Sequence, residues 1–483
     1  MPKARPILTL ALLSAIALPQ PGLAQSGSSQ GAATAAMLKD LIRIDTSNAP
    51  GDTREVADYL KRRFDAAGIP NEIILAPNGK AAHFIARLKG DGSKRPLLIA
   101  AHTDVVPAEK ARWSVDPFGG IEKDGFIYGR GALDNKGAVA AFATAVLRLK
   151  AQGTKLSRDI IFLAEADEEQ GVYNTNWLAQ NHWPKLDAEF SLNEGERPMW
   201  DGRTVTQFNV SYADKLTLNL KLTATGETGH SSRPLPLDQT ANGQLIAALD
   251  RLMRYETAIE LNAPARAYFE AVAETTPSLR PPVAKLLAAA DQPALKAAAR
   301  DLVASDPRAR DAQGLLRNTL VVTMIDSGIK PNVIPGTAEA VINARLLPGT
   351  TVDAFIAELR AVIGNDRIAI EPSRPGKSTS EVIAYYRERS SMAPSSLDTP
   401  LFAAIEKAVA QTWPKARVLP TIIVGATDAT PWRQRGIPVY GIAPFPVTPE
   451  QTGGMHGDDE RIAVQAVIEG SAFVARLLTE AAR

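Results

Sequence analysis

The chain has 483 residues, 45% of them hydrophobic and 22% charged, with a formal net charge of +1 at pH 7 and no cysteine. A chain of this length exceeds what one hydrophobic core usually supports, so we expect a soluble globular protein with two domains. The balanced charge argues against a nucleic-acid partner, and the lack of cysteine excludes disulfide bonds and thiolate metal sites.

Residues 1–24 are predicted to be a signal peptide. Two basic residues near the start precede an apolar run, 7–18, that is too short to span a bilayer, and small residues favour cleavage after Ala24. A buried N-terminal helix is the alternative, but prolines and the polar segment 25–31 would end such a helix. We therefore expect an exported protein, periplasmic or secreted, with no stable membrane anchor.

Helix-like and strand-like segments alternate along the next part of the chain. Helical periodicity marks 35–44, 53–67 and 137–149, and strand-like patterns mark 71–76, 83–88, 96–101 and 159–164. Such alternation implies an α/β fold with a mostly parallel sheet. Ligands of such sheets bind at the carboxyl ends of the strands, so residues that follow these strands are candidate site residues.

The pattern changes in the second half of the chain. The following segments spell the order βαββαβ of a ferredoxin-like unit: 215–225, 237–254, 318–326, 338–346, 352–363 and 367–371. An alanine-rich helical insertion at about 256–316 interrupts this unit. We therefore expect a catalytic domain in two parts, 25–213 and 374–483, with a second domain inserted at 214–373. The segment 372–397 is expected to be the return linker.

Two segments carry the first candidate metal-site residues. The strand 97–101 delivers His102 and Asp104 to the same side of its end, and Asp104 is suited to orient the imidazole of His102. Asp134, just before a predicted helix, has two carboxylate oxygens and is the candidate bridge between two cations. Each has an ordinary alternative, a strand-end turn for the first pair and a helix N-cap for Asp134.

More acidic residues and another histidine follow later strands. Glu168 and Glu169 come after a buried strand, and one is suited to bind metal while the other acts as a general base. Glu194 ends another apolar strand, and His456 lies in a glycine-rich loop before the C-terminal helix. Taken singly, each is typical of a solvated turn or helix start. Together, these histidines and carboxylates at the strand ends of one sheet predict a two-metal hydrolase site.

These motifs, AHTDVVP, GRGALDNKG, EADEEQG, NEG and GGMHGDDE, resemble those of the M20 family of metallopeptidases and amidohydrolases. The resemblance covers essentially all of the mature chain and is closest to the aminoacylase and carboxypeptidase S branch. It implies two divalent metal ions, for which zinc is the preferred identity and cobalt and manganese are the alternatives. It implies one metal held by His102, Asp134 and Glu194 and another by Asp134, Glu169 and His456, with Glu168 as general base and Asp104 as the partner of His102.

The resemblance extends to the inserted domain, which it implies is a lid or dimerisation domain. In TGETGHSSRP it makes His230 the residue that stabilises the tetrahedral oxyanion, from the same chain or across a homodimer. Asn332, Arg345 and Gly425 fall where the family places substrate contacts, and a guanidinium suits a substrate carboxylate. Thr430 departs from the family pattern, in which arginine is common at this place.

The sequence therefore predicts hydrolysis of an amide or peptide bond in a small molecule or short peptide with a free carboxylate. A dipeptide, a C-terminal residue or an N-acyl amino acid would qualify. A bi-zinc aminopeptidase is one alternative, against which His230 and Arg345 argue. A non-catalytic binding protein is the other, against which Glu168 argues because binding needs no base. The two remaining histidines, His83 and His182, belong to no motif and are expected to be structural.

Overall fold

The computed structural model describes residues 21–483 except 201–202, 306–312, 375 and 426. Most of the predicted signal peptide, residues 1–20, lies outside the described residues. Helix α1 spans Pro21–Arg43, so the expectation that the polar segment 25–31 ends a helix is wrong. Its small residues let α1 pack closely on α15 (Val464–Ala482): a Cβ at Gly31 would lie 2.7 Å from the Cα of Ile468.

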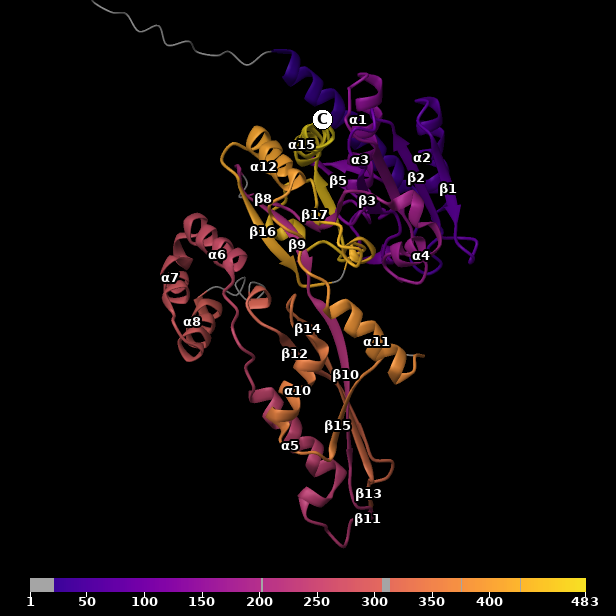
Figure 1. Ribbon diagram of the computed structural model, residues 1–483. Helices are drawn as coiled ribbons and strands as arrows, with labels where there is room; N and C mark the ends of the chain where they lie inside the picture. The colour runs from indigo at the N-terminus through magenta and orange to yellow at the C-terminus, as the bar shows by residue number, and fades with distance from the viewer. Residues whose placement is uncertain (1–20, 201–202, 306–312, 375, 426) are drawn as a thin grey trace, which may run out of the picture.

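A sheet of nine strands forms the centre of the larger part of the molecule (Figure 1). Its order is β1-β2-β6-β3-β7-β17-β9-β16, and β8 pairs with β9. The pairings of β6, β3, β7 and β17 in the middle are parallel, as predicted, whereas β1, β2 and β6 pair antiparallel toward one edge. The strands are β1 (Asn71–Leu75), β2 (Ala82–Leu88), β3 (Leu97–His102), β6 (Ile160–Glu165), β7 (Phe190–Glu196), β8 (Pro198–Trp200), β9 (Val205–Asp214), β16 (Arg417–Ile423) and β17 (Val439–Ile442).

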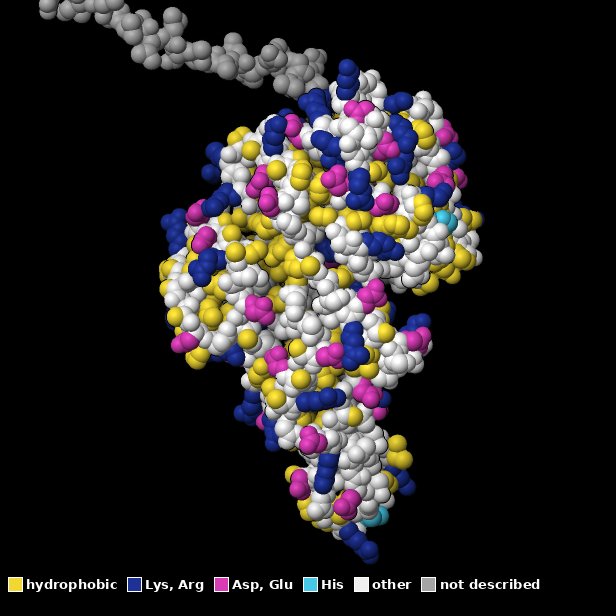
Figure 2. All heavy atoms as spheres, in the orientation of Figure 1, with side chains coloured by type: hydrophobic (Ala, Val, Ile, Leu, Met, Phe, Trp, Pro, Cys, Tyr) yellow, Lys and Arg dark blue, Asp and Glu magenta, His cyan; other side chains and the backbone are white. Residues whose placement is uncertain are grey.

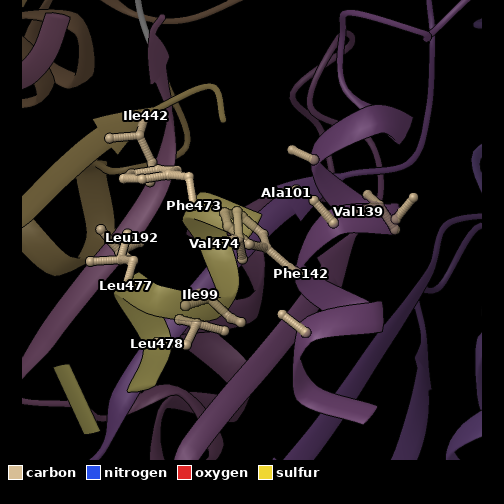
Figure 3. Close-up of a cluster of buried hydrophobic side chains, with 14 of the residues drawn as sticks. Ile99, Ala101, Val139, Phe142, Leu192, Ile442, Phe473, Val474, Leu477 and Leu478 are labelled. Carbon is tan, nitrogen blue, oxygen red and sulfur yellow. The ribbon is translucent and has the colours of Figure 1, made fainter. Parts of the chain in front are cut away.

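Helices cover both faces of this first sheet, because its buried strands send alternate side chains to opposite faces. On one face Ile99 packs with Phe142 of α3 and Phe473 of α15 (Figure 3). On the other face Leu98 packs in a cluster with Trp432 of α13. Full burial of each such side chain contributes roughly 1.5–3 kcal/mol. The helices are α1, α2 (Arg54–Ala66), α3 (Lys136–Ala151), α12 (Pro400–Thr412) and α15 on the first face, and α4 (Thr175–Leu186) and α13 (Thr430–Arg433) on the second.

A second sheet of four antiparallel strands extends away from the first (Figure 1). Its order is β12-β14-β10-β15, and with α5 and α10 the chain order is the predicted βαββαβ. A small two-stranded sheet of β11 and β13 lies at the end of this unit farthest from the first sheet. The elements are β10 (Leu216–Thr225), β11 (Gly229–His230), α5 (Ala241–Arg254), β12 (Thr319–Ser327), β13 (Val333–Ile334), β14 (Thr337–Leu346), α10 (Val352–Ile363) and β15 (Ile368–Pro372).

The segment 372–397 contains a helix, α11 (Thr379–Ser390), and not only a linker. Val382 and Tyr386 of α11 are buried in the core of the second sheet. These two residues are four apart, which places both on one face of a helix. The linker prediction is wrong for this helix, because a polar composition hid an apolar pair that packs only once the second sheet has formed.

The helical insertion packs against the edge of the first sheet (Figure 1). Its α6 runs along β16, and Gln207 Nε2 of β9 donates to Thr275 Oγ1 of α6 at 2.5 Å. The insertion also has a small core of its own around Phe269, Val283 and Leu302. Its helices are α6 (Ala263–Thr275), α7 (Arg280–Ala288) and α8 (Gln292–Ser305). Among the described residues, no helix combines the length and the apolar composition needed to cross a membrane.

The remaining short elements lie beside the first sheet. They include a three-stranded sheet in the order β18-β5-β4 and one short helix: β4 (Ile121–Lys123), β5 (Phe126–Tyr128), α14 (Pro449–Thr452) and β18 (Arg461–Ala463).

Candidate metal centre

The candidate centre lies at the carboxyl ends of neighbouring parallel strands. β3 ends at His102, the chain after β6 leads to Glu168, and β7 carries Glu194 near its end. Parallel strands end on the same edge of a sheet, so these side chains meet there. Asp134 arrives from just before α3, and His456 from the turns before β18.

The carboxylate of Asp134 stands between two histidines. Its Oδ1 lies 2.9 Å from His102 Nε2, and its Oδ2 lies 3.1 Å from His456 Nε2. His102 Nε2 is also 3.3 Å from Glu194 Oε2, and His456 Nε2 is 3.1 Å from Glu169 Oε1. The structure thus brings together the two residue sets that the family resemblance implies, with Asp134 common to both.

Asp104 makes two kinds of contact. Its carboxylate accepts hydrogen bonds from the backbone at Glu168 and Glu169, and its carbonyl oxygen contacts the ring of His102. His102 Nδ1 is 3.0 Å from the backbone oxygen of Asp104 but 3.9 Å from its carboxylate. The carboxylate accepts hydrogen bonds from the backbone N–H groups of Glu168 and Glu169, both at 3.1 Å, and from Asn48 Nδ2 at 2.6 Å. Asp104 is thus placed to orient His102, as expected, and it does so through its carbonyl oxygen rather than its carboxylate. An N–H at Nδ1 donated to this carbonyl leaves the Nε2 lone pair facing Asp134, as a metal ligand requires.

The donor set fits divalent cations. Ligand atoms of His102, Asp134 and Glu169 lie within 4.8 Å of one another, as do those of Glu168, Glu194 and Asp428. Imidazole nitrogens and carboxylate oxygens without thiolates are the ligands of catalytic zinc, manganese and cobalt. A single carboxylate between two imidazoles also offers one oxygen to each of two cations.

The crowded carboxylates and histidines shift one another's protonation. Burial, followed by the neighbouring charge of Glu194, raises the pKa of Glu168 to about 8. Hydrogen bonds to Asp134 and Glu169 raise the pKa of His456 to about 10. Protons therefore neutralise part of this acidic cluster when no cation is bound. Cation binding must displace these protons, so metal affinity should rise with pH.

The metal-free protein is expected to lose thermal stability as the pH rises from about 6.5 to about 10. The folded pKa of His456 lies above the unfolded value of about 6.5, so its contribution is complete below that pH and is lost as the pH rises through about 10. The melting temperature of chelator-treated protein across this range checks the expectation. His456→Gln should flatten the slope, and the control His182→Gln should not. An unchanged slope in His456→Gln would contradict the ion pairing.

Three polar residues of the centre lie outside the ligand set inferred from the motifs. Asn48 donates to Asp104, and Asn135 Nδ2 donates to Glu194 Oε2 at 3.4 Å. Asp428 is 2% exposed, and burial raises its pKa to about 7. Asn135 follows Asp134 within the motif GRGALDNKG, and Asp428 lies between Gly425 and Thr430, so their sequence neighbours could have indicated both. Nothing in the sequence marks Asn48, because its contact depends on the approach of a distant loop.

His230 and Asn332 lie together at the far end of the second sheet (Figure 1). Asn332 Nδ2 is 3.5 Å from His230 Nε2, and Ser232 Oγ is 2.8 Å from His230 Nδ1. The ten-residue strand β10 connects the two ends of this sheet, and a strand of that length spans roughly 30 Å. Within one described chain, neither residue reaches the metal-ligand set.

Arg345 and Gly425 lie where the second sheet meets the first. Arg345 Nη1 is 3.5 Å from the carbonyl oxygen of Val424, the neighbour of Gly425, and burial lowers the pKa of Arg345. A Cβ at Gly425 would meet only the Ile423 side chain at 3.7 Å, so the protein's own packing does not require glycine there. Thr430, at the place of the family's arginine, is buried in α13.

His83 and His182 belong to the packing around α4. His83 accepts a hydrogen bond from the backbone N–H of Ala166 at 3.0 Å, and burial lowers its pKa to about 3. Both rings contact Trp177, with centroid distances of 5.9 Å for His83 and 5.5 Å for His182. Neither histidine belongs to the metal-ligand set.

Two cavities open beside the centre. The first, of about 710 Å³, has Asp134 and Glu194 at one end and side chains of the helical insertion at the other; we call it the apolar chamber. Figure 2 shows hydrophobic side chains gathered where the insertion meets the first sheet. The second, of about 790 Å³, is lined by Glu168 and Asp428; we call it the polar chamber. Its wall also contains three arginines, Arg374, Arg389 and Arg435.

Comparisons with known proteins agree on one family. Residues 98–480 match the profile of Peptidase family M20/M25/M40. The N-fatty-acyl-amino acid synthase/hydrolase PM20D1 of Bos taurus is 28% identical over 463 residues, covering 89% of this chain and 84% of the relative. The probable carboxypeptidase S-like 2 of Dictyostelium discoideum is 30% identical over 395 residues, covering 78% and 69%. Aminoacylase-1 of Sus scrofa is 26% identical over 457 residues, covering 92% and 94%.

Solved structures share the fold. The M20 family metallo-carboxypeptidase Sso-CP2 of Sulfolobus solfataricus has a TM-score of 0.63 at 18% sequence identity, covering 93% of this chain and 99% of that one. The YXEP protein of Bacillus subtilis, a dinuclear metal binding peptidase from the M20 family, has a TM-score of 0.56 at 14% identity, covering 94% and 98%.

Proposed function

The chain belongs to Peptidase family M20/M25/M40, and on that basis we propose that it is a zinc-dependent hydrolase of N-acyl amino acids that carry a free carboxylate. Family membership makes it a hydrolase of peptides or N-acyl amino acids. The observation that supports the proposal most is the carboxylate of Asp134 between His102 and His456, with Glu168 beside this set. A non-catalytic binding protein would have no need of a general base such as Glu168.

Glu168 is proposed to move the proton during hydrolysis. When bound, two divalent cations would polarise the scissile carbonyl and increase the acidity of the attacking water. The Glu168 carboxylate accepts a proton from that water as its oxygen bonds to the carbonyl carbon. Glu168 then donates the proton to the leaving nitrogen as the C–N bond breaks. Asp104 keeps Glu168 in place through the backbone N–H group.

The residues proposed to bind each cation follow from the contacts of Asp134 with the two histidines. His102, Asp134 and Glu194 would hold one cation, and Asp134, Glu169 and His456 the other. Zinc is proposed because two imidazoles and several carboxylates, without cysteine, form a catalytic rather than a structural zinc set. Reconstitution of the metal-free enzyme with zinc, cobalt or manganese, followed by kcat measurement, tests the identity of the metal.

The substrate carboxylate is proposed to bind on the side of the second sheet. Arg345 donates to Thr217 Oγ1, and Thr217 lines the polar chamber. The arginines of that chamber add positive charge beside the candidate centre. A guanidinium pairs with a carboxylate through two parallel hydrogen bonds, which suits recognition of a free amino-acid carboxylate.

The purified zinc enzyme is expected to hydrolyse N-acyl amino acids and to leave amino-acid amides intact. An α-carboxylate gains bidentate pairing with a guanidinium, whereas an amide in its place leaves the arginine donors without a charged partner. Release of the free amino acid from N-acyl amino acids, dipeptides and amino-acid amides measures the preference. Hydrolysis of the amides alone would show an aminopeptidase and overturn the proposal.

His230 is proposed to act on the centre of a second copy of the chain. The hinge between the two sheets, Asp214, is hydrogen-bonded to Thr427 beside Asp428, so the hinge lies next to the candidate centre. Rotation about this hinge preserves the length of β10, which holds His230 roughly 30 Å away. Closure of one chain alone therefore does not bring its His230 to its own centre, contrary to the simplest expectation for a lid.

His230→Ala is expected to lower kcat by about 10²–10³-fold, the usual cost of an oxyanion donor, without loss of metal. Mixing His230→Ala with Glu168→Ala distinguishes a shared centre from a self-contained one. If two chains share each centre, mixed dimers contain one centre with both residues intact, and activity should recover to about a quarter of the unmodified level. No recovery would place His230 in its own chain's centre, and metal loss in His230→Ala would place it among the ligands.

Residues 1–24 are proposed to direct export. The N-terminal sequence of protein recovered from outside the cytoplasm of an expressing bacterium should begin at Gln25. An intact Met1 in that fraction would contradict cleavage.

A further inference from the structure

We propose that the apolar chamber binds the hydrocarbon chain of a long-chain N-acyl amino acid, so that the helical insertion 256–316 selects the acyl group. This inference rests on the proposed function, because the chamber begins at the candidate metal ligands Asp134 and Glu194. An acyl chain bound in this chamber would therefore extend from the amide bond that the metal centre cleaves.

The lining of the chamber combines polar groups of the metal centre with an apolar surface from the insertion. Asp134, Asn135 and Glu194 form the end at the metal centre. The apolar lining comes from the insertion and from β16, through Phe269, Val272, Leu279, Leu302, Leu315 and Ile422, and Gln207 and Asn209 of β9 also line the chamber. Among the described residues of the insertion, none that lines the chamber is charged. Polar groups at the metal centre and an apolar surface on the insertion suit a ligand with an amide head and a hydrocarbon tail.

The size of the chamber favours a long chain over a short one. Its volume is about 710 Å³. A water molecule takes roughly 30 Å³ in the liquid, so the chamber has room for about 20 groups of that size. A methylene group is similar in size to a water molecule. An acetyl group or a single amino-acid side chain would leave most of this apolar surface exposed to water.

Two sets of contacts tie the helical insertion to the rest of the molecule. Lys215, the first residue after the hinge, donates through Nζ to the backbone oxygens of Gly314 at 2.9 Å and Arg317 at 2.6 Å, which fixes the end of the insertion. Arg417 of β16 also forms an exposed ion pair with Glu274, near the end of α6. Contacts that hold a wall in place lower the cost of ordering the protein when a flexible chain binds.

An extended peptide fits this chamber less well than a hydrocarbon chain. Each peptide residue would bury an N–H and a C=O group that need hydrogen-bond partners. The side chains of the insertion that line the chamber offer two such partners, the hydroxyl groups of Tyr268 and Thr276, and the strands β9 and β16 add Gln207, Asn209 and Thr421. A hydrocarbon chain needs none, and each methylene that it buries is stabilising.

The chain-length dependence of the unmodified enzyme tests the proposal without any variant. N-acyl derivatives of one amino acid, from acetyl through butanoyl, octanoyl and dodecanoyl to hexadecanoyl, are compared by kcat/KM. The expected increase is up to about fourfold per methylene, the equivalent of about 0.8 kcal/mol for each buried CH₂, until the chamber is full. A flat profile with active enzyme would leave the proposed function standing and overturn the acyl chamber, as would faster hydrolysis of hydrophobic peptides.

A matched pair of variants places the effect in the chamber. Val272 lines the chamber from α6, whereas Glu270 of the same helix is exposed and does not line it. Val272→Trp is expected to lower kcat/KM for the dodecanoyl substrate by about 50-fold, the value of roughly three methylenes, and to shorten the preferred chain. Glu270→Trp should keep the profile of the unmodified enzyme. Equal profiles for the two variants would overturn the proposal.

Binding of dodecanoate separates the acyl chamber from the proposed reaction. Calorimetry with the unmodified enzyme and with Val272→Trp requires no hydrolysis. Binding that weakens in Val272→Trp, in an enzyme that cleaves no N-acyl amino acid, would support the chamber and overturn the proposed function. No dodecanoate binding by the unmodified enzyme, together with a flat chain-length profile, would overturn the chamber alone.

Discussion

Glu168→Ala is expected to lower kcat by about 10²–10⁴-fold, the usual contribution of a positioned general base, while both metals stay bound. The neighbouring Glu169 should remain in place because its own backbone N–H is held by the Asp104 carboxylate at 3.1 Å. The five ligands of the two sets are also left intact by this change. Measurement of kcat and of metal content on the same preparation tests both the loss of turnover and the retention of metal.

The control for this change is another glutamate that lies away from the centre. Glu406 is exposed on α12, so Glu406→Ala should keep both turnover and metal content. Near-normal turnover in Glu168→Ala would remove Glu168 from its proposed role. Loss of metal together with turnover would instead make it a ligand, and Asp428, which lies within 4.8 Å of it by ligand atoms, would become the next candidate base.

Asp134→Asn is expected to weaken both metals at once and to abolish detectable turnover. Substitution of a residue that only hydrogen-bonds to a metal ligand lowers metal affinity by about 10–100-fold. Loss of a ligand shared by two metals should lower the affinity for each metal by at least as much. The amide is nearly the same size as the carboxylate, but it lacks the charge and presents an N–H₂ donor to His102 or His456. Metal content after dialysis, with kcat at saturating zinc, measures the effect.

Asp458→Asn provides a matched control for this second change. Asp458 lies two residues after His456 and pairs with Arg112 at 2.7 Å, outside both ligand sets. It should keep two metal equivalents and normal turnover. If Asp134→Asn lost only one metal, the bridging role would be wrong and Asp134 would belong to a single cation.

The ligand set was readable from the chain because it follows a local rule. Strands β3, β6 and β7 are apolar segments of ordinary length, and the residues that follow them are polar. Once these strands pair in parallel, their ends must share an edge. The positions of His102, Glu168 and Glu194 therefore needed no knowledge of side-chain packing. The sequence did not predict that the carbonyl oxygen of Asp104, rather than its carboxylate, contacts the His102 ring. The backbone conformation of the residues that follow β3 decides which oxygen meets the ring.

The second sheet shows the opposite case. Its βαββαβ order was predictable from periodicity, but the distance of His230 from the centre depends on how the whole sheet leaves the hinge. Helix α11 was hidden for a similar reason. Val382 and Tyr386 become core residues only against strands that are distant in the chain.

By itself, the sequence determined the fold class, the residues that gather at the strand ends and the metal chemistry that they support. Alternating strands and helices, spacing and residue type are local properties, and one sheet edge converts them into a site. Only the tertiary structure decided what surrounds that site. The packing of the insertion on β16, the resulting apolar chamber and the remoteness of His230 arise from contacts between segments far apart in the chain. Such contacts follow from complementary surfaces of folded elements, which periodicity and motif spacing do not encode.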